Sequence, residues 1–328
     1  MNVAVGVISP APIWVMPRRW VDWLRREFPQ HTFIDAWDRD TLRRVLPRAD
    51  VAFTPFVDAD IFASLTRLKW VQSPAAGVGG LMYPALVASD VVITSARGIR
   101  ARAMAEHVLG VAIALARRFP AAMRAQLAHR WAQDDLEGPD SGVRTLHGQR
   151  IGIVGLGAIG IEVARIAAPF GLRVSAVRRH VDRPKPEGVD EVFAPERLHR
   201  LLEQSDILLV AAPHTSETRQ LIGRREVAAL KRGAFVINVA RGKLVDDAAL
   251  IDALSAGQVG GAALDVFTTE PLPADSPYWD LPNVIVTPHV SGAMEDYWTP
   301  LLALFAENLR RFERGEPLLN AVDKAAGY

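Results

Sequence analysis

Residues 150–178, RIGIVGLGAIGIEVARIAAPFGLRVSAVR, carry glycines spaced as G-x-G-x-x-G between a short apolar run and an amphipathic segment. The run 151–154 is typical of a buried parallel strand, the segment after the glycines of a helix, and 172–177 of a second strand. In this βαβ setting the first glycine permits a tight turn, the second lets a pyrophosphate approach the backbone, and the third lets helix and strand pack closely. The helix N-terminus adds unpaired N–H groups and a positive dipole end. The sequence therefore predicts a Rossmann nucleotide-binding domain whose cofactor loop is Gly155, Leu156, Gly157, Ala158, Ile159 and Gly160.

The end of the second strand discriminates between the two nicotinamide dinucleotides. A site for NAD usually has Asp or Glu there, accepting hydrogen bonds from the adenosine ribose 2′-OH. This chain has Arg178 and Arg179 instead, with no acid before Asp182. Guanidinium groups bind phosphate through charge-assisted, often bidentate hydrogen bonds. We therefore predict NADP(H) as the preferred cofactor and NAD(H) as an alternative. The competing interpretation is a solvated basic loop, since Arg183 and Lys185 follow.

The composition is that of an ordinary globular protein. Of the 328 residues, 49% are hydrophobic and 23% are charged, and the net charge is +1. This charge balance predicts neither a nucleic-acid partner nor a membrane-surface partner. The chain contains no cysteine, which excludes disulfides, zinc–thiolate sites and thiol catalysis and fits a reducing cytoplasm. We predict a cytoplasmic protein that has no membrane span and binds no metal.

Ahead of residue 100, short β-rich runs alternate with helical segments, a pattern typical of a parallel sheet. The predicted strands are 3–8, 31–34, 51–53, 69–72 and 91–94. The predicted helices include 18–28, 41–46 and 61–66. This first unit is therefore expected to be an α/β domain of its own, with a flavodoxin-like sheet.

An Ala-rich helix, 101–118, follows, and because it is apolar around most of its circumference it should be buried between the two units. The more polar stretch 119–147 is interpreted as a dimerisation arm. The last helix is predicted over 300–314, with Thr299 as its N-cap and Gly315 as its stop. The later strands of the nucleotide-binding unit are predicted at 191–193, 206–211, 234–239, 262–265 and 284–287.

The predicted fold is α/β, with two doubly wound parallel-sheet domains. The Rossmann nucleotide-binding domain, 99–292, is inserted into the flavodoxin-like substrate-binding domain, 1–98 and 293–328. A chain of 328 residues is long enough to form two domains. A cleft between two such domains is where ligands usually bind.

In open α/β sheets ligands bind at the carboxyl ends of strands, and three such ends in the second unit carry reactive side chains. Arg241 follows an apolar strand, Asp265 and Glu270 lie at or just past the next, and His289 stands behind a proline in TPHVSG. Taken singly, Arg241 is typical of a salt-bridge partner, Glu270 of a turn residue and His289 of a core histidine. Together, behind a dinucleotide fingerprint, Arg241, Glu270 and His289 predict a catalytic site.

An arginine, a carboxylate and a histidine beside a nicotinamide suit one reaction class. Hydride transfer to a ketone leaves an alkoxide that needs a proton, and histidine is the natural donor near neutral pH. A neighbouring carboxylate favours the imidazolium form. Arginine can bind a substrate carboxylate and polarise the adjacent carbonyl. The substrate that uses all three is a small 2-oxo acid, reduced to a 2-hydroxy acid.

Over essentially its whole length the chain resembles the D-isomer-specific 2-hydroxyacid dehydrogenase family, and within it most closely the glyoxylate/hydroxypyruvate reductases. The matching stretches are LKWVQSPAAGVG, MAEHVLGVAIALAR, RIGIVGLGAIG, DILLVAAPHTSET, GAFVINVARGKLVDDAALIDAL, GAALDVFTTEPLP and NVIVTPHVSG. The resemblance implies NAD(P)-dependent reduction of the 2-oxo acid to the D-2-hydroxy acid. The Ala-rich helix 101–118 and the arm 119–147 predict a homodimer.

The resemblance further implies a role for individual residues. Arg241 would bind and orient the substrate, Glu270 would tune the histidine, and His289 would be the acid/base. Asp265 would contact the nicotinamide carboxamide. Backbone N–H groups of Ala76 and Gly77 would hold the substrate carboxylate, as a glycine-bearing anion nest can. The cofactor contacts expected beyond the glycine loop and Arg178–Arg179 are Ala212, Pro213, Thr218, Val239, Ala240, Arg241, Asp265, His289, Ser291 and Gly292.

Several residues keep two interpretations. Trp131, in the arm, either packs on the arm or reaches a partner subunit's active site, as the resemblance suggests. Phe56 and Trp298 are either pocket walls or core aromatics. His107 is expected to be structural, and His214 to line the cofactor groove. The alternative function is a nucleotide-sensing, corepressor-like binding protein on the same fold.

Overall fold

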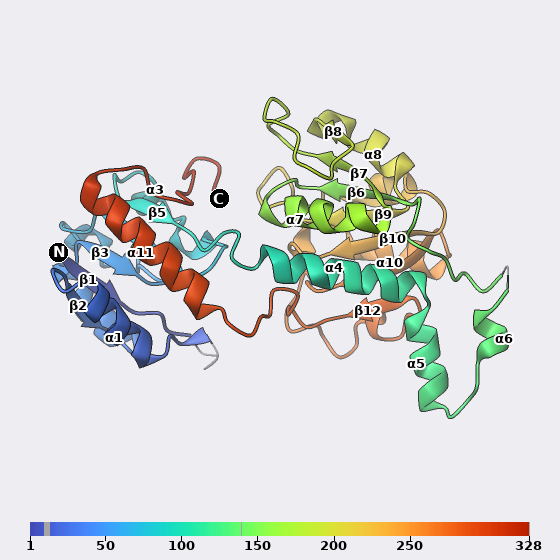
Figure 1. Cartoon of the computed structure of the whole chain (residues 1–328), viewed down its shortest axis with the longest axis horizontal. Coiled ribbons are helices and arrows are strands. Elements are labelled where there is room, and N and C mark those ends of the chain that lie inside the picture. The colour runs from blue at the N-terminus through green and yellow to red at the C-terminus, as the bar shows by residue number, and fades with distance from the viewer. Residues whose placement is uncertain (10–13, 139, 328) are drawn as a thin grey trace. The chain divides into compact units, whose positions relative to one another are not determined.

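Short runs of β-branched and aromatic residues form two parallel sheets in the computed structural model, which describes residues 1–9, 14–138 and 140–327. The chain divides into two units, Met1–Ile99 with Glu295–Tyr328, and Arg100–Met294 (Figure 1). The second unit is thus continuous in sequence, and in the order of the sequence it falls between the two segments of the first. None of the described helices is long and apolar enough to cross a membrane.

The first unit is built on a five-stranded parallel sheet of order β2-β1-β3-β4-β5. This is the flavodoxin-like order. Its strands are β1 Asn2–Val5, β2 Thr32–Asp35, β3 Val51–Phe53, β4 Trp70–Gln72 and β5 Val92–Thr94. Its helices are α1 Arg18–Glu27, α2 Arg39–Val45, α3 Pro84–Val87 and α11 Trp298–Arg314.

Alternation along each strand builds the two layers of this unit. Val51 and Phe53 of β3 face a cluster that includes residues of α1 and α11, whereas Ala52 between them faces the cluster that includes α2 and α3. The ring of Phe53 stacks on that of Phe305 in α11, with centroids 4.4 Å apart. The carboxy-terminal helix is therefore part of the core of the first unit.

Two local predictions in this unit were wrong. Residues 61–66 form only a 3₁₀ turn, Phe62–Ser64, in which no residue is buried. The N–H groups of Ser64 and Leu65 donate to the carbonyls three residues earlier, at 2.9 and 3.0 Å, instead of four residues earlier as in an α-helix. Thr299 is not the N-cap of α11: the helix begins at Trp298, two residues before the predicted start, and the N–H of Thr299 is bound by the carboxylate of Asp296 at 3.0 Å. At the other end, Gly315 adopts φ +66° and ends the helix as predicted.

The second unit is built on a seven-stranded parallel sheet of order β12-β11-β10-β9-β6-β7-β8. The order reverses between β6 and β9, the arrangement of a Rossmann sheet, so the predicted fold class is confirmed. Its strands are β6 Arg150–Val154, β7 Arg173–Val177, β8 Glu191–Phe193, β9 Ile207–Val210, β10 Ala234–Asn238, β11 Val259–Leu264 and β12 Val284–Val286. Its helices are α4 Ala101–Ala116, α5 Phe119–Leu127, α6 Gln133–Leu136, α7 Ala158–Ala167, α8 Leu198–Gln204, α9 Arg224–Ala228 and α10 Asp247–Ser255.

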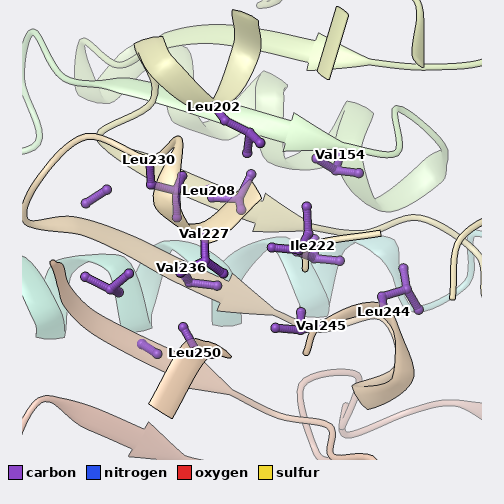
Figure 2. Close-up of a cluster of buried hydrophobic side chains, with 14 of the residues drawn as sticks. Val154, Leu202, Leu208, Ile222, Val227, Leu230, Val236, Leu244, Val245 and Leu250 are labelled. Carbon is purple, nitrogen blue, oxygen red and sulfur yellow. The ribbon is translucent and has the colours of Figure 1, made fainter. Parts of the chain in front are cut away.

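Both faces of this sheet are covered, as a parallel sheet requires. In β9, Ile207 and Leu209 pack toward α4 and α7, whereas Leu208 and Val210 pack into the cluster formed with α8, α9 and α10. Figure 2 shows this second cluster, with Leu208 among side chains from several elements. The Ala-rich helix α4 is buried against the sheet and α7 of its own unit (Figure 1).

Candidate functional site

The glycine turn lies at the carboxyl end of β6, the central strand next to the reversal of strand order. Gly155 has φ +102°, and a Cβ on it would lie 2.5 Å from the backbone nitrogen of Ala212. Its N–H donates to the carbonyl of Val177, the last residue of β7, at 3.0 Å. Only glycine meets both the backbone angle and the lack of space. Gly160 is as confined, since its Cβ would lie 2.5 Å from the carbonyl oxygen of Gly155.

Gly157 differs from its neighbours because nothing lies within 4 Å of the place its Cβ would take. It is the exposed N-cap of α7 and leads into Ala158 and Ile159 of the first helical turn. The N–H groups of such a first turn have no partner within the helix. This open, donor-lined space beside a helix N-terminus fits the pyrophosphate of a dinucleotide.

The two arginines after β7 have different surroundings. The Nη2 of Arg178 donates to the carbonyl oxygens of Arg183 and Pro184, so that its guanidinium fastens the loop that follows. Arg179 is more exposed, and its Nη2 forms an ion pair with Glu217. The carboxylate of Glu217 comes from the segment after β9, on the far side of β6 in the sheet.

Two of the predicted catalytic side chains are in direct contact. Nδ1 of His289 lies 2.8 Å from Oε2 of Glu270. The other carboxylate oxygen, Oε1, accepts the backbone N–H of Phe267 at 2.9 Å. The side chain of His289 is 51% exposed and that of Glu270 is 35% exposed, so the pair faces solvent on one side. Glu270 thus fixes one ring nitrogen of His289 and leaves Nε2 for a ligand.

The backbone around His289 is held by Asp265. This buried carboxylate accepts hydrogen bonds from Thr287 Oγ1 at 2.6 Å and from the N–H groups of Val290 and Ser291 at 2.8 and 2.9 Å. The N–H of His289 donates to the carbonyl of Asp265 at 2.9 Å. His289 itself has φ +55°, a conformation that non-glycine residues adopt at a cost. Hydrogen bonds on both sides of the residue offset that cost.

Arg241 lies in the turn after β10. Its backbone carbonyl accepts from the side-chain amide of Asn238 at 3.1 Å, and its Nη1 donates to the carbonyl of Ala240 at 2.6 Å. The next residue, Gly242, touches the turn that carries Glu270, since a Cβ there would lie 1.9 Å from the carbonyl carbon of Phe267. The turns bearing Arg241 and Glu270 are therefore packed directly on each other.

The remaining predicted cofactor contacts lie at the same edge of the sheet. Ala212, Val239 and Ala240 are buried next to their strand ends. Thr218 Oγ1 donates to the carbonyl of Pro213 at 2.7 Å and so closes the loop after β9. Ser291 is buried and Gly292 packs against the start of α4, where its Cβ would lie 2.9 Å from Cδ of the N-cap residue Arg100.

Ala76 and Gly77 belong to the other unit. They are exposed in the loop after β4, which is fastened by reciprocal hydrogen bonds between Ser73 Oγ and the backbone of Ala75, each 3.1 Å long. Their role in substrate binding stays a prediction, as do the roles of the other residues described above.

The three aromatic residues with two interpretations lie in the first unit and in the arm. Phe56 and Trp298 both pack against core clusters of the first unit, and the Arg39 guanidinium lies 5.3 Å from the ring of Phe56. Trp131 is 88% exposed in the arm. His107 is partly buried in α4, and burial lowers its pKa although the charge of Asp265 opposes the shift.

Sequence reasoning missed three polar residues that shape this region: Asn238, Thr287 and Glu217. The first two stand within the quoted INVARG and TPHVSG stretches, and each is polar at the end of an apolar strand, which could have marked them. Glu217 lies in PHTSET, and nothing local indicates its distant partner Arg179.

Comparison with known proteins shows the family to which the chain belongs. Residues 109–291 match the family model for the D-isomer specific 2-hydroxyacid dehydrogenase, NAD binding domain. The chain is 34% identical over 275 residues to the glyoxylate reductase of Korarchaeum cryptofilum, covering 82% of this chain and 80% of that protein. It spans about half the length of the D-3-phosphoglycerate dehydrogenases that it also matches, such as that of Mycobacterium tuberculosis, with 35% identity over 300 residues, 90% of this chain and 55% of the relative.

Solved structures superpose on nearly the whole chain. The D-isomer specific 2-hydroxyacid dehydrogenase of Xanthobacter autotrophicus, in complex with NADPH and MES, has a TM-score of 0.82 and 35% identity and covers 99% of both chains. The NADPH-dependent glyoxylate/hydroxypyruvate reductase of Sinorhizobium meliloti, in complex with NADP and sulfate, has a TM-score of 0.82 and 29% identity over the full length of both chains. With its two parallel sheets, glycine turn and matching family model, this chain belongs to the D-isomer specific 2-hydroxyacid dehydrogenases.

Proposed function

We propose that this enzyme uses NADPH to reduce a small 2-oxo acid of the glyoxylate or hydroxypyruvate kind to the D-2-hydroxy acid. The observation that carries the proposal is the contact of His289 with Glu270 at 2.8 Å, at the carboxyl edge of a dinucleotide-binding sheet. A proton donor held by a carboxylate at that edge is what carbonyl reduction requires.

The proposed chemistry follows from the geometry of these residues. NADPH, when bound, supplies the hydride. His289 presents Nε2 to the substrate oxygen, because Nδ1 is held by Glu270, and donates the proton that the new alkoxide needs. The Glu270 carboxylate stabilises the imidazolium before transfer. Arg241 binds the substrate carboxylate and polarises the neighbouring carbonyl.

The residues that would hold the cofactor are the glycine turn, the first turn of α7, and the arginines after β7. The open space at Gly157 supports a pyrophosphate there. Arg178 and Arg179, in the place where an acid would bind a ribose 2′-OH, support a 2′-phosphate and hence NADPH over NADH. The Xanthobacter and Sinorhizobium proteins, which are bound to NADPH and NADP, support the same choice.

The proposal assigns 99–292 to the cofactor and 1–98 with 293–328 to the substrate, whose carboxylate would meet Ala76 and Gly77. It includes a homodimer formed through the arm. On α5, Phe119, Met123 and Leu127 recur at helical spacing and are 49%, 62% and 82% exposed, and a second copy would cover this apolar stripe. The proposed compartment is the cytoplasm, supported by the lack of cysteine.

The test is the loss of NADPH absorbance with glyoxylate, hydroxypyruvate, pyruvate and phenylpyruvate, repeated with NADH. We expect oxidation of NADPH by a small 2-oxo acid and slower reaction with NADH. Turnover of ketones without a carboxylate would contradict the role given to Arg241. Binding of NADPH without turnover of any 2-oxo acid would favour a nucleotide-sensing protein.

A further inference from the structure

The ion pair between Arg179 and Glu217 crosses the end of the sheet where a dinucleotide would lie. Arg179 follows β7, and Glu217 belongs to the segment that follows β9. In the sheet, β6 lies between these two strands. The pair therefore spans the carboxyl end of β6 and its glycine turn, beside the reversal of strand order at which Rossmann sheets bind dinucleotides.

The pair places a carboxylate on the arginine that is proposed to bind the 2′-phosphate. A carboxylate and a phosphate offer a guanidinium the same kind of charge-assisted hydrogen bond. Both cannot take the same donors, and a dianionic phosphate beside Glu217 would meet like-charge repulsion. The Nη2 of Arg178 donates to the carbonyls of its own loop. Glu217 therefore competes with a phosphate for Arg179 rather than for Arg178.

We propose that Glu217 is a specificity-determining residue that occupies the 2′-phosphate's place on Arg179 until NADP(H) displaces it. This inference rests on the proposed cofactor preference and adds to it a competitor within the chain. The exchange is feasible because the pair is open to solvent, with side chains 44% and 72% exposed, and exposed ion pairs are weak. NAD(H) has no phosphate at this position and gains nothing from Arg179, so the competition selects against NADP(H) alone.

The loop that carries Glu217 is ordered without the ion pair. Thr218 Oγ1 donates to the carbonyl of Pro213 at 2.7 Å, and the N–H of Thr215 donates to Thr218 Oγ1 at 2.8 Å. Loss of the carboxylate should therefore leave the loop in place, and Glu217→Gln tests the charge rather than the fold.

The experiment is calorimetric titration of the full chain with NADP+ and with NAD+. The proteins are the wild type, Glu217→Gln, Arg179→Gln, the double variant, and Glu203→Gln as a control. Glu203 is an exposed acid on α8, so it matches the change in net charge. We expect Glu217→Gln to bind NADP+ about 2–5-fold more tightly and NAD+ no more tightly, the scale of a weak exposed ion pair. Glu203→Gln should bind both like the wild type, and the gain should vanish in the Arg179→Gln background.

The inference is overturned if Glu217→Gln weakens NADP+, which would make Glu217 a support for Arg179 rather than a competitor. It is also overturned if NAD+ tightens by the same factor, or if Glu203→Gln has the same effect. The proposed cofactor preference is tested by the titrations of the wild type alone: tighter binding of NAD+ than of NADP+ would refute it. A wild type that prefers NADP+ together with an unresponsive Glu217→Gln leaves the preference standing and removes only the competitor.

Discussion

Glu270 holds His289 by one oxygen while its own turn holds the other. Oε2 lies 2.8 Å from Nδ1 of the imidazole, and Oε1 accepts the N–H of Phe267 at 2.9 Å. The hydrogen bond from Phe267 already orients the carboxylate. Holding the imidazole with Nε2 free for the proposed substrate would therefore cost little further conformational entropy. Asp265 performs the matching task for the backbone, by binding the loop on either side of the histidine.

Removal of the imidazole should stop proton donation without disturbing the cofactor. We expect His289→Ala to lower kcat for 2-oxo acid reduction by roughly 10²–10⁴-fold and to leave the Kd for NADPH nearly unchanged. A control is available in His199→Ala, because His199 also contacts a glutamate, Glu226 at 3.1 Å, with a side chain 54% exposed. Steady-state kinetics and calorimetry would check both variants. Near-normal turnover by His289→Ala would remove this residue from the mechanism.

Alanine substitutions at two glycines of the cofactor turn should have different effects, one on cofactor binding and the other on stability. Gly157→Ala meets open space, so we expect an unchanged Tm and greatly weakened NADPH binding, since the methyl group would occupy the place of the pyrophosphate. Gly155→Ala combines φ +102° with a contact of 2.5 Å to Ala212. It should lose at least about 1–3 kcal/mol of stability from backbone strain alone. Thermal unfolding and calorimetry measure the two effects, and equal losses of stability would contradict this distinction.

Acid should destabilise the protein partly through His107. Burial holds the pKa of this histidine below its ordinary value of 6.5, so the unfolded chain binds a proton more readily than the folded one. The contribution of His107 is therefore complete above about pH 6.5 and is lost as the pH falls below it. We expect His107→Gln to lose less stability than the wild type between pH 7.5 and 5.5, measured by urea unfolding. His180→Gln, at an exposed position, should keep the wild-type dependence on pH, and identical slopes for all three proteins would refute the effect.

The apolar stripe of the arm should control assembly. We expect the wild type to sediment at twice its chain mass of 35.9 kDa, and Leu127→Glu to sediment as a monomer, because a charge would be buried in the interface. Gln126→Glu, on the same helix at another exposed position, should remain a dimer. A wild type that is monomeric at micromolar concentration would reject the arm as a dimerisation surface.

Much of the fold could be predicted from local pattern. The strands 51–53 and 191–193 were predicted at their observed bounds, and the others within a few residues, because each is a short apolar run set between turn residues. The family resemblance is confirmed by the comparisons. The error at 61–66 occurred where a local propensity had no matching buried face. The error at Thr299 occurred because Asp296, three residues earlier, binds the N–H of Thr299 inside the first turn of the helix.

The sequence by itself determined the Rossmann turn, because Gly155 and Gly157 do their work through their own backbone, and it placed Arg241, Glu270 and His289 at strand ends. Only the tertiary structure decided what these residues contact. Residue pairs such as Asp265 with Ser291, 26 positions apart, and Arg179 with Glu217, 38 positions apart, arise from the order of strands in the sheet. Such contacts depend on which carboxyl ends lie side by side, and that is settled by the packing of whole helices and strands rather than by any local run of residues.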